Sequence, residues 1–177
     1  MLSDSASLKP VHRDVYAARE RAAGALAAAG ARVRREHLKG MRRAVELYLA
    51  TLRDDRIPDG VTRRSMSAGR ALAREVDEVI GDGVLLHPPF PRTAPRHGMT
   101  IGRPWLLANA ALFNLLELPV TQVPLGLSTS GLPVGVQVAA SRDDDHVTIA
   151  VALELERVFG GWVPPEAARE RGTRTPA

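Results

Sequence analysis

Apolar residues recur every three or four positions along the first eighty residues, which is the spacing of amphipathic helices. The spacing predicts helices at residues 15–29, 41–53 and 62–80. Glycines at positions 30, 81 and 83 are typical helix stops, and Asp14 precedes the first helix. Residues 31–35 suit a short strand, and residues 54–60 suit a surface loop.

From residue 84 onward, short apolar runs between turn residues replace the helical spacing. Strands are predicted at residues 84–87, 119–125 and 132–139, with a turn at 128–131. Their continuous apolar runs are typical of parallel strands that are covered on both sides. Residues 88–102, rich in Pro and Gly, form a long ordered loop, and loops of this kind often carry function. Helices are predicted at residues 104–116, apolar nearly all round and therefore buried, and at residues 145–159.

The length and the apolar content indicate one folding unit. A chain of 177 residues with 45% apolar residues suffices for one core and is short for two. We place the domain at residues 14–163, with an N-terminal tail at 1–13 and a charged C-terminal tail at 164–177.

Composition and charge narrow the function classes. The absence of cysteine excludes disulfides, thiolate metal sites and a cysteine nucleophile. Lys and Arg outnumber Asp and Glu by 16 to 11 in residues 1–80, but they number 8 against 9 afterwards. The arginines are interleaved with acids rather than gathered in a stripe, so nucleic-acid binding is not expected. No secretory segment or membrane-spanning run is recognisable, which favours a cytoplasmic protein.

Four segments of the second half resemble one enzyme family. They are Asn114-Leu-Leu-Glu-Leu-Pro-Val-Thr-Gln-Val-Pro-Leu-Gly126, Ser130-Gly-Leu-Pro-Val-Gly-Val-Gln-Val138, the run from Asp145 to Pro164, and Leu85-Leu-His-Pro-Pro with Thr93-Ala-Pro95. In order and spacing they look like the C-terminal part of amidase-signature hydrolases, closest to the fatty-acid amide hydrolase 2 branch. The resemblance implies a partial amidase-signature α/β fold, in which a mixed β-sheet is flanked by α-helices.

The same resemblance implies a chemistry that these residues lack. The family hydrolyses amides through an acyl-serine intermediate, with a lysine base, a bridging serine and a nucleophilic serine in a Gly-Ser-rich segment. This sequence has only Lys9 and Lys39 and no Gly-Gly-Ser-Ser element. We therefore expect a truncated or split amidase that is inactive alone, and we assign no catalytic, cofactor-binding or metal-binding residue and no cofactor.

The main alternative is a non-catalytic structural or binding subunit that complements a separate chain carrying the catalytic residues. A small amide would then be a substrate only of the complemented enzyme. Within either alternative, the loop at 88–102 is our candidate for a wall of the substrate channel.

Several other residues have a plainer interpretation. Ser128, Thr129 and Ser130 suit a turn, and Ser65 and Ser67 suit a helix start or surface, so a catalyst built on Ser130 or Ser67 with a histidine is least favoured. The histidines at 12, 37, 87, 97 and 146 lack metal-ligand spacing, although His87 and His97 frame the loop and are candidates for a pocket. Asp143, Asp144 and Asp145 suit helix capping, and Trp105 and Phe113 suit core packing.

Overall fold

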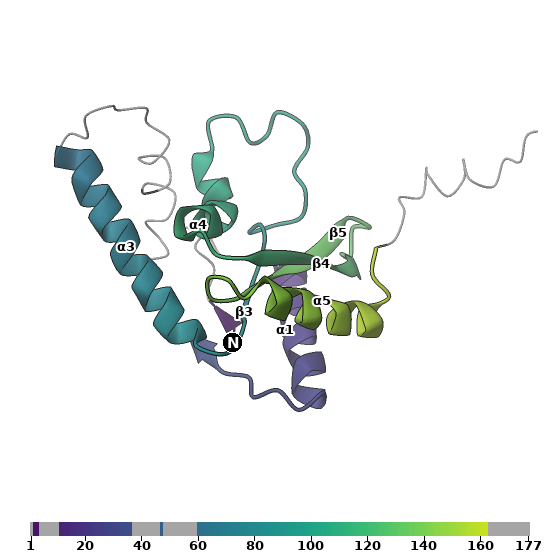
Figure 1. The fold of residues 1–177 in the computed structure, drawn as a ribbon. Helices are drawn as coiled ribbons and strands as arrows, with labels where there is room; N and C mark the ends of the chain where they lie inside the picture. The colour runs from purple at the N-terminus through teal and green to yellow at the C-terminus, as the bar shows by residue number, and fades with distance from the viewer. Residues whose placement is uncertain (1, 4–10, 37–46, 48–59, 163–177) are drawn as a thin grey trace, which may run out of the picture.

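The computed structural model describes residues 2–3, 11–36, 47 and 60–162 of the chain. Its elements are β1 (Leu2–Ser3), α1 (Arg13–Ala28), β2 (Arg35–Glu36), α3 (Gly60–Ile80), β3 (Leu85–His87), the 3-10 turn η2 (Pro104–Leu107), α4 (Ala108–Leu116), β4 (Val120–Leu127), β5 (Pro133–Ala139) and α5 (Asp145–Phe159). The strands form one sheet in the order β2-β1-β3-β5-β4. Because β1 is parallel to β2 and β3 while β5 is antiparallel to β3 and β4, the sheet is mixed. Helices lie on both sides of it, which confirms the expected α/β fold (Figure 1).

The hairpin of β4 and β5 corrects one expectation. Val120 pairs with Ala139 and Val123 with Val136 in antiparallel register, so the prediction of parallel strands was wrong. Parallel neighbours require a crossover of a dozen or more residues, whereas the connection at 128–132 is a short turn. The continuous apolar runs reflect burial instead, because β5 is covered by α1 and α5 on one side and partly by α4 on the other.

The predicted helices of the described residues are present. Helices α1, α3 and α5 begin and end within two residues of the predicted bounds, and Gly30 follows α1 at φ +97°. The predicted helix at 104–116 begins as η2 and continues as α4. Two short strands differ more: β2 occupies only the end of the stretch predicted at 31–35, and β1 was not predicted.

Some predictions fall on other parts of the chain. The helix at 41–53 and the loop at 54–60 lie outside the described residues, except for Leu47 and Gly60. Lys9, Lys39, His37 and the tail at 164–177 also lie outside them. The division into a domain at 14–163 and two tails therefore stays a prediction.

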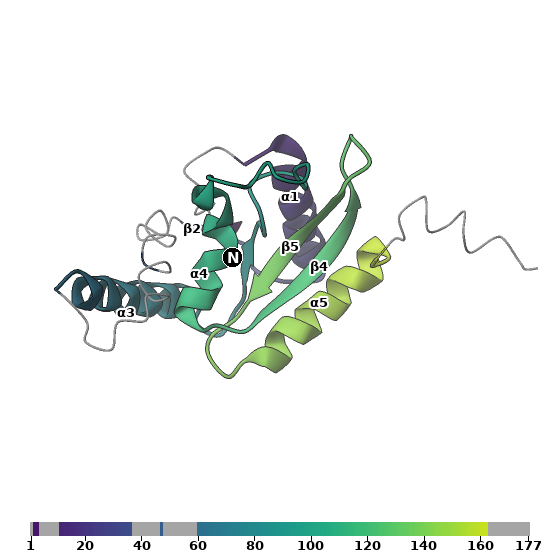
Figure 2. The ribbon, with the colours of Figure 1, turned by 90° about the horizontal axis from the view of Figure 1, so that it is seen from above.

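The two faces of the sheet carry different cores. The face that bears Leu86, Val136 and Val138, here named the closed face, packs against α1 and α5. The opposite face, here named the open face, packs against α3 and α4 at one end, around Leu85 and Ala139. Cross-strand register places His87, Gln137 and Gln122 side by side on the open face. In the view of Figure 2, α4 and α5 lie on opposite sides of the β4–β5 hairpin.

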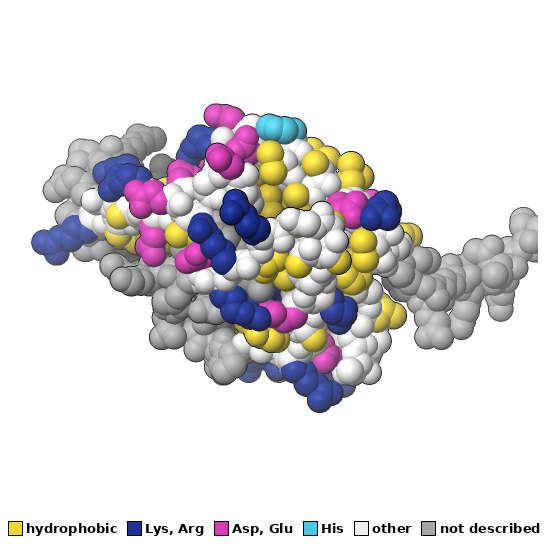
Figure 3. All heavy atoms as spheres, turned by 90° about the horizontal axis from the view of Figure 1, so that it is seen from below, with side chains coloured by type: hydrophobic (Ala, Val, Ile, Leu, Met, Phe, Trp, Pro, Cys, Tyr) yellow, Lys and Arg dark blue, Asp and Glu magenta, His cyan; other side chains and the backbone are white. Residues whose placement is uncertain are grey.

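The outer surface mixes charge with apolar groups. Figure 3 shows basic and acidic side chains next to one another on the face seen from below, with apolar patches between them. Ile149, Leu153 and Trp162 are among the exposed large apolar side chains. Of the helices that the structure describes, none combines the length and apolar character needed to cross a membrane.

Candidate functional site

The loop between β3 and η2 is anchored at both of its sides. The N–H of His12, at the start of α1, donates to the carbonyl of Pro91 over 2.7 Å. On the other side, buried Asn109 of α4 donates from Nδ2 to the carbonyl of Pro88 over 2.8 Å. Arg103 closes the loop by donating to the carbonyl of Met99 over 2.8 Å. These bonds fix the course of the backbone, as expected for a long ordered loop.

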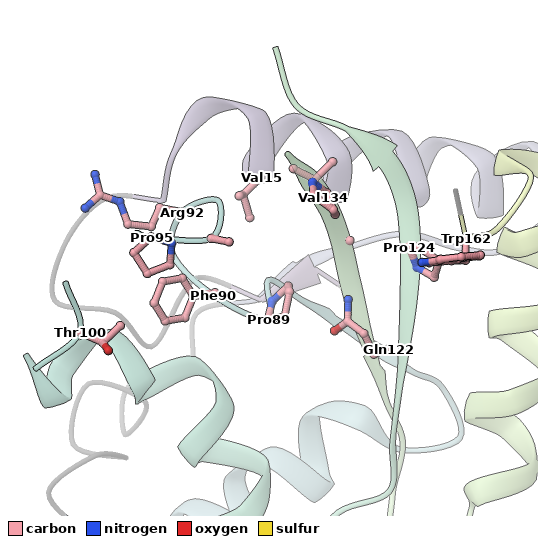
Figure 4. A pocket seen from close by; sticks show the side chains of 13 residues that line it. Val15, Pro89, Phe90, Arg92, Pro95, Thr100, Gln122, Pro124, Val134 and Trp162 are labelled. Carbon is pink, nitrogen blue, oxygen red and sulfur yellow. The ribbon is translucent and has the colours of Figure 1, made fainter. Parts of the chain in front are cut away.

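A cleft of about 570 Å³ lies between this loop and the β4–β5 hairpin (Figure 4). The loop provides Pro89, Phe90, Arg92, Ala94, Pro95 and Thr100; α1 provides Val15; the hairpin provides Gln122, Pro124, Pro133, Val134 and Gly135; and Trp162 follows α5. Most of these groups are apolar, and the volume suits a small organic ligand. The cleft is therefore the candidate functional site, which we name the hairpin cleft.

Charge plays little part inside the hairpin cleft. Arg92 is the charged residue among those that line it. In Figure 4 its guanidinium points away from Gln122 and the hairpin, toward the outside. A neutral apolar ligand suits this lining, because burying an unpaired charge beside such walls costs free energy.

One contact between distant residues holds the tip of the hairpin. The carboxylate oxygen Oδ2 of Asp14 accepts the N–H of Thr129 over 3.0 Å and its hydroxyl over 2.7 Å. The bond from the Thr129 hydroxyl, followed by the bond from its N–H, holds the pKa of the Asp14 carboxyl below its ordinary value. Since Val15 and Pro133 line the cleft, this contact ties two of its walls together.

The serines near this tip form a turn, as expected. The Ser128 hydroxyl lies 3.0 Å from that of Ser130 and accepts the N–H of Leu132 over 3.1 Å. The N–H of Ser128 donates to the carbonyl of Leu132 over 2.7 Å, which closes the turn. Ser67 is exposed on α3, far along the chain from this tip.

His87 lies in the core rather than in the cleft. Its ring packs edge-on against Phe113 of α4, with ring centroids 5.2 Å apart. Burial, and then the nearby charge of Arg19, lower the pKa of His87 to about 3, so the ring is neutral at pH 7. His97 is exposed on the loop, and neither histidine lines the hairpin cleft.

The remaining candidates are structural or surface groups. Phe113 is 4% exposed, as expected for core packing, whereas the side chain of Trp105 lies outside the described part. Capping by all three aspartates was wrong: Asp144 occupies the N-cap of α5, but its side chain makes no cap hydrogen bond, and Asp143 adopts φ +68°. Within the described ranges, no group of three or more His, Asp or Glu side chains is placed to hold a metal ion.

Sequence reasoning found the loop but missed the hairpin side of the cleft. Gln122, Pro124 and Gly135 line the cleft from β4 and β5, and Trp162 lines its mouth. Gln122 was a usable signal, because it is a polar residue inside the apolar run at 119–125. A polar residue in an otherwise buried strand indicates either a hydrogen-bond partner for its side chain or a cavity that the side chain faces.

Comparison with known proteins identifies relatives of part of the chain. No family model matches the sequence. Fatty-acid amide hydrolase 2 of Homo sapiens is 49% identical over 96 residues, covering 54% of this chain and 18% of that protein. Fatty-acid amide hydrolase 2-B of Danio rerio is 50% identical over 95 residues, covering 53% of this chain and 18% of that protein. The matched residues thus span less than a fifth of the length of these relatives.

Two solved structures superpose on this chain and share its fold. The 6-aminohexanoate cyclic dimer hydrolase superposes with a TM-score of 0.75 at 20% identity, over 94% of this chain and 46% of that one. A glutamyl-tRNA(Gln) amidotransferase subunit from Thermotoga maritima superposes with a TM-score of 0.73 at 23% identity, over 88% and 41%. The chain is therefore similar in sequence to fatty-acid amide hydrolase 2 over about half of its length, and its partial α/β fold is that of amidase-signature structures.

Proposed function

We propose that these residues form the substrate-holding part of an amidase that hydrolyses apolar carboxylic amides through an acyl-serine intermediate. The observation that carries the proposal is the apolar hairpin cleft, in a chain whose relatives are fatty-acid amide hydrolases. The ordered loop at 88–102 and the β4–β5 hairpin are its two walls. An acyl chain placed between them gains about 0.8 kcal/mol for each methylene group that leaves water.

The catalytic groups of this proposal come from outside the 177 residues. The sequence has no Gly-Gly-Ser-Ser element, and the described serines near the cleft, Ser128 and Ser130, hold a turn. A nucleophilic serine needs an adjacent base, and the described part of the chain provides none beside these two hydroxyls. We propose that a further segment of the same polypeptide, or a separate chain, supplies the two serines and the lysine.

The decisive experiment measures amide hydrolysis with and without that segment. The purified 177-residue chain is assayed on octanamide and on an aryl amide, alone and mixed with the serine- and lysine-bearing part of a fatty-acid amide hydrolase 2. We expect turnover only in the mixture. Turnover by the chain alone would contradict the proposal, because it would require a nucleophile within these residues.

A blocking variant links the expected activity to the cleft. Ala94 is exposed yet lines the cleft, so Ala94→Trp fills the space without disturbing the core. His97→Trp, on the same loop but outside the cleft, is the matched control. We expect Ala94→Trp to raise KM for octanamide in the mixture while His97→Trp leaves it unchanged. Equal KM values for octanamide in the two variants would show that the substrate binds elsewhere.

We propose a second candidate, a non-catalytic binding subunit, because of the outer face of α5. Ile149 is 52% exposed and Leu153 is 60% exposed on that helix, a surface that a complementing chain would cover. Light scattering after size-exclusion chromatography tests this idea, with and without the complementing segment. A monodisperse monomer that unfolds cooperatively and ignores the segment would argue against it.

A further inference from the structure

Gln122 is a polar side chain in the middle of an apolar site. It lies on β4, in register with Gln137 of β5, on the open face of the sheet. Its side chain is exposed and projects into the hairpin cleft between Pro89 and Pro124 (Figure 4). Its amide therefore meets whatever fills the cleft.

The backbone around Gln122 leaves room for this amide. Gly135 lies diagonally across the hairpin, and a Cβ atom at that position would come within 2.5 Å of Gln122 Nε2. Any side chain at position 135 would thus push the amide away from the sheet. Glycine there lets the Gln122 amide lie close to β5 where both residues line the cleft.

Other polar groups of the cleft do not compete for the same position. The Arg92 guanidinium points away from the hairpin, and Thr100 lies near the far end of the loop (Figure 4). Within the described residues, the Gln122 side chain makes no hydrogen bond to the protein. Its Nε2–H and Oε1 are consequently available to a ligand.

We propose that Gln122 is a specificity-determining residue that selects ligands bearing a carboxamide on an apolar chain. The amide oxygen Oε1 accepts the N–H of the ligand carboxamide, a donor that a ketone lacks. This inference rests on the proposed function, since it assigns the polar contact within that cleft. An apolar ligand without such a group would bury the Gln122 amide unpaired, so the site discriminates against plain hydrocarbon.

The test uses two probes of nearly equal shape. Octanamide and 2-nonanone share a heptyl chain and a carbonyl, but the ketone has a methyl group where the amide has NH2. Isothermal titration calorimetry of the 177-residue chain measures both dissociation constants for the native sequence and for Gln122→Leu. Asn114→Leu, which changes an exposed amide on α4 outside the cleft, is the matched control.

We expect Gln122→Leu to weaken octanamide binding ~3- to 10-fold, the factor for one neutral hydrogen bond. The ketone should lose less, because it keeps only the acceptor, and Asn114→Leu should change neither constant. Equal effects of Gln122→Leu on both probes, with binding retained, would overturn the inference and leave the cleft proposal standing. If neither probe binds the native chain, both proposals fail. Circular dichroism of each variant shows whether a loss comes from unfolding instead.

Discussion

The closed and open faces of the same two strands are built differently. Along β5, Val136 and Val138 point to the closed face and are fully buried against α1 and α5. The residues between and beside them, Gly135 and Gln137, point to the open face. One face therefore carries fully buried branched apolar side chains, and the other carries a glycine, which lines the hairpin cleft, and a polar side chain.

This difference separates stability from binding within one hairpin. A β-strand directs alternate residues to opposite faces, so each face can change without altering the other. The closed face packs against α1 and α5, and the open face packs against α3 and α4 around Ala139 but lines the hairpin cleft at Gln122, Pro124 and Gly135. Substitutions on the two faces should accordingly differ in what they affect.

The largest effect is expected on the closed face. Leu155 of α5 is 0% exposed, and Leu155→Ala should lower the free energy of unfolding by about 2–5 kcal/mol through lost burial and a residual cavity. Leu153→Ala, on the outer side of the same helix, should change it by less than about 0.5 kcal/mol. Urea unfolding followed by circular dichroism measures both. Similar losses for the two variants would mean that α5 does not seal the closed face.

The next effect concerns pH and the buried end of the open face. The pKa of His87 is lowered from 6.5 to about 3 by burial, so the folded chain keeps this ring neutral while the unfolded chain protonates it. Stability is fully present above pH 6.5 and falls as the pH drops toward 3, by up to about 1.4 kcal/mol per unit. The free energy of unfolding, measured between pH 6.5 and pH 4.5, reports this slope.

Two variants isolate the contribution of that ring. His87→Leu removes the titrating group and should flatten the slope between pH 6.5 and pH 4.5. His97→Leu removes an exposed histidine of the neighbouring loop and should leave the slope as it is. A native chain whose stability stays constant over this window would show that His87 is protonated in the folded state.

The closed face and its helices could be predicted from the sequence, because local patterns determine them. Helix α5 has the bounds that its spacing indicated, Asp145 to Phe159. The strands β4 and β5 followed from apolar runs around the turn at 128–131. The antiparallel orientation of the two strands could not be predicted from these runs. A continuous apolar run indicates that a strand is buried on both faces, but it does not indicate the direction of the neighbouring strand.

The hairpin cleft could be predicted only in part, because it joins residues that are far apart in the chain. The loop at 88–102 was recognisable from its Pro and Gly content. Pairing of Asp14 with Thr129 spans 115 positions, and the two-residue strand β1 has too few residues to show any period. Such contacts depend on how the elements pack, which no local pattern contains.

A smaller change in the free energy of unfolding is expected from a substitution at Gly135, which lines the cleft. Gly135→Ala places a Cβ within 2.5 Å of the Val123 carbonyl oxygen, a backbone atom that cannot move away freely. We expect a loss of about 1–3 kcal/mol in the free energy of unfolding. Gly24→Ala, in α1 with nothing within 4 Å of its Cβ, should instead stabilise the chain by about 0.5–1 kcal/mol. Thermal unfolding with opposite signs for the two alanines would confirm the close approach, and a neutral Gly135→Ala would refute it.

The smallest effect is local and concerns the contact that joins α1 to the hairpin tip. Asp14→Asn removes the charge that accepts two hydrogen bonds from Thr129, so the amide hydrogen of Thr129 should exchange faster with solvent. Asp77→Asn, on the exposed side of α3, should leave that exchange rate unchanged. Because these bonds lower the pKa of Asp14, the native contact should persist at neutral pH and weaken only as the pH falls below the ordinary value of 3.8. Hydrogen exchange followed by NMR resolves the Thr129 amide alone; unchanged exchange in Asp14→Asn would mean that the turn at 128–131 holds the tip of the hairpin without help from α1.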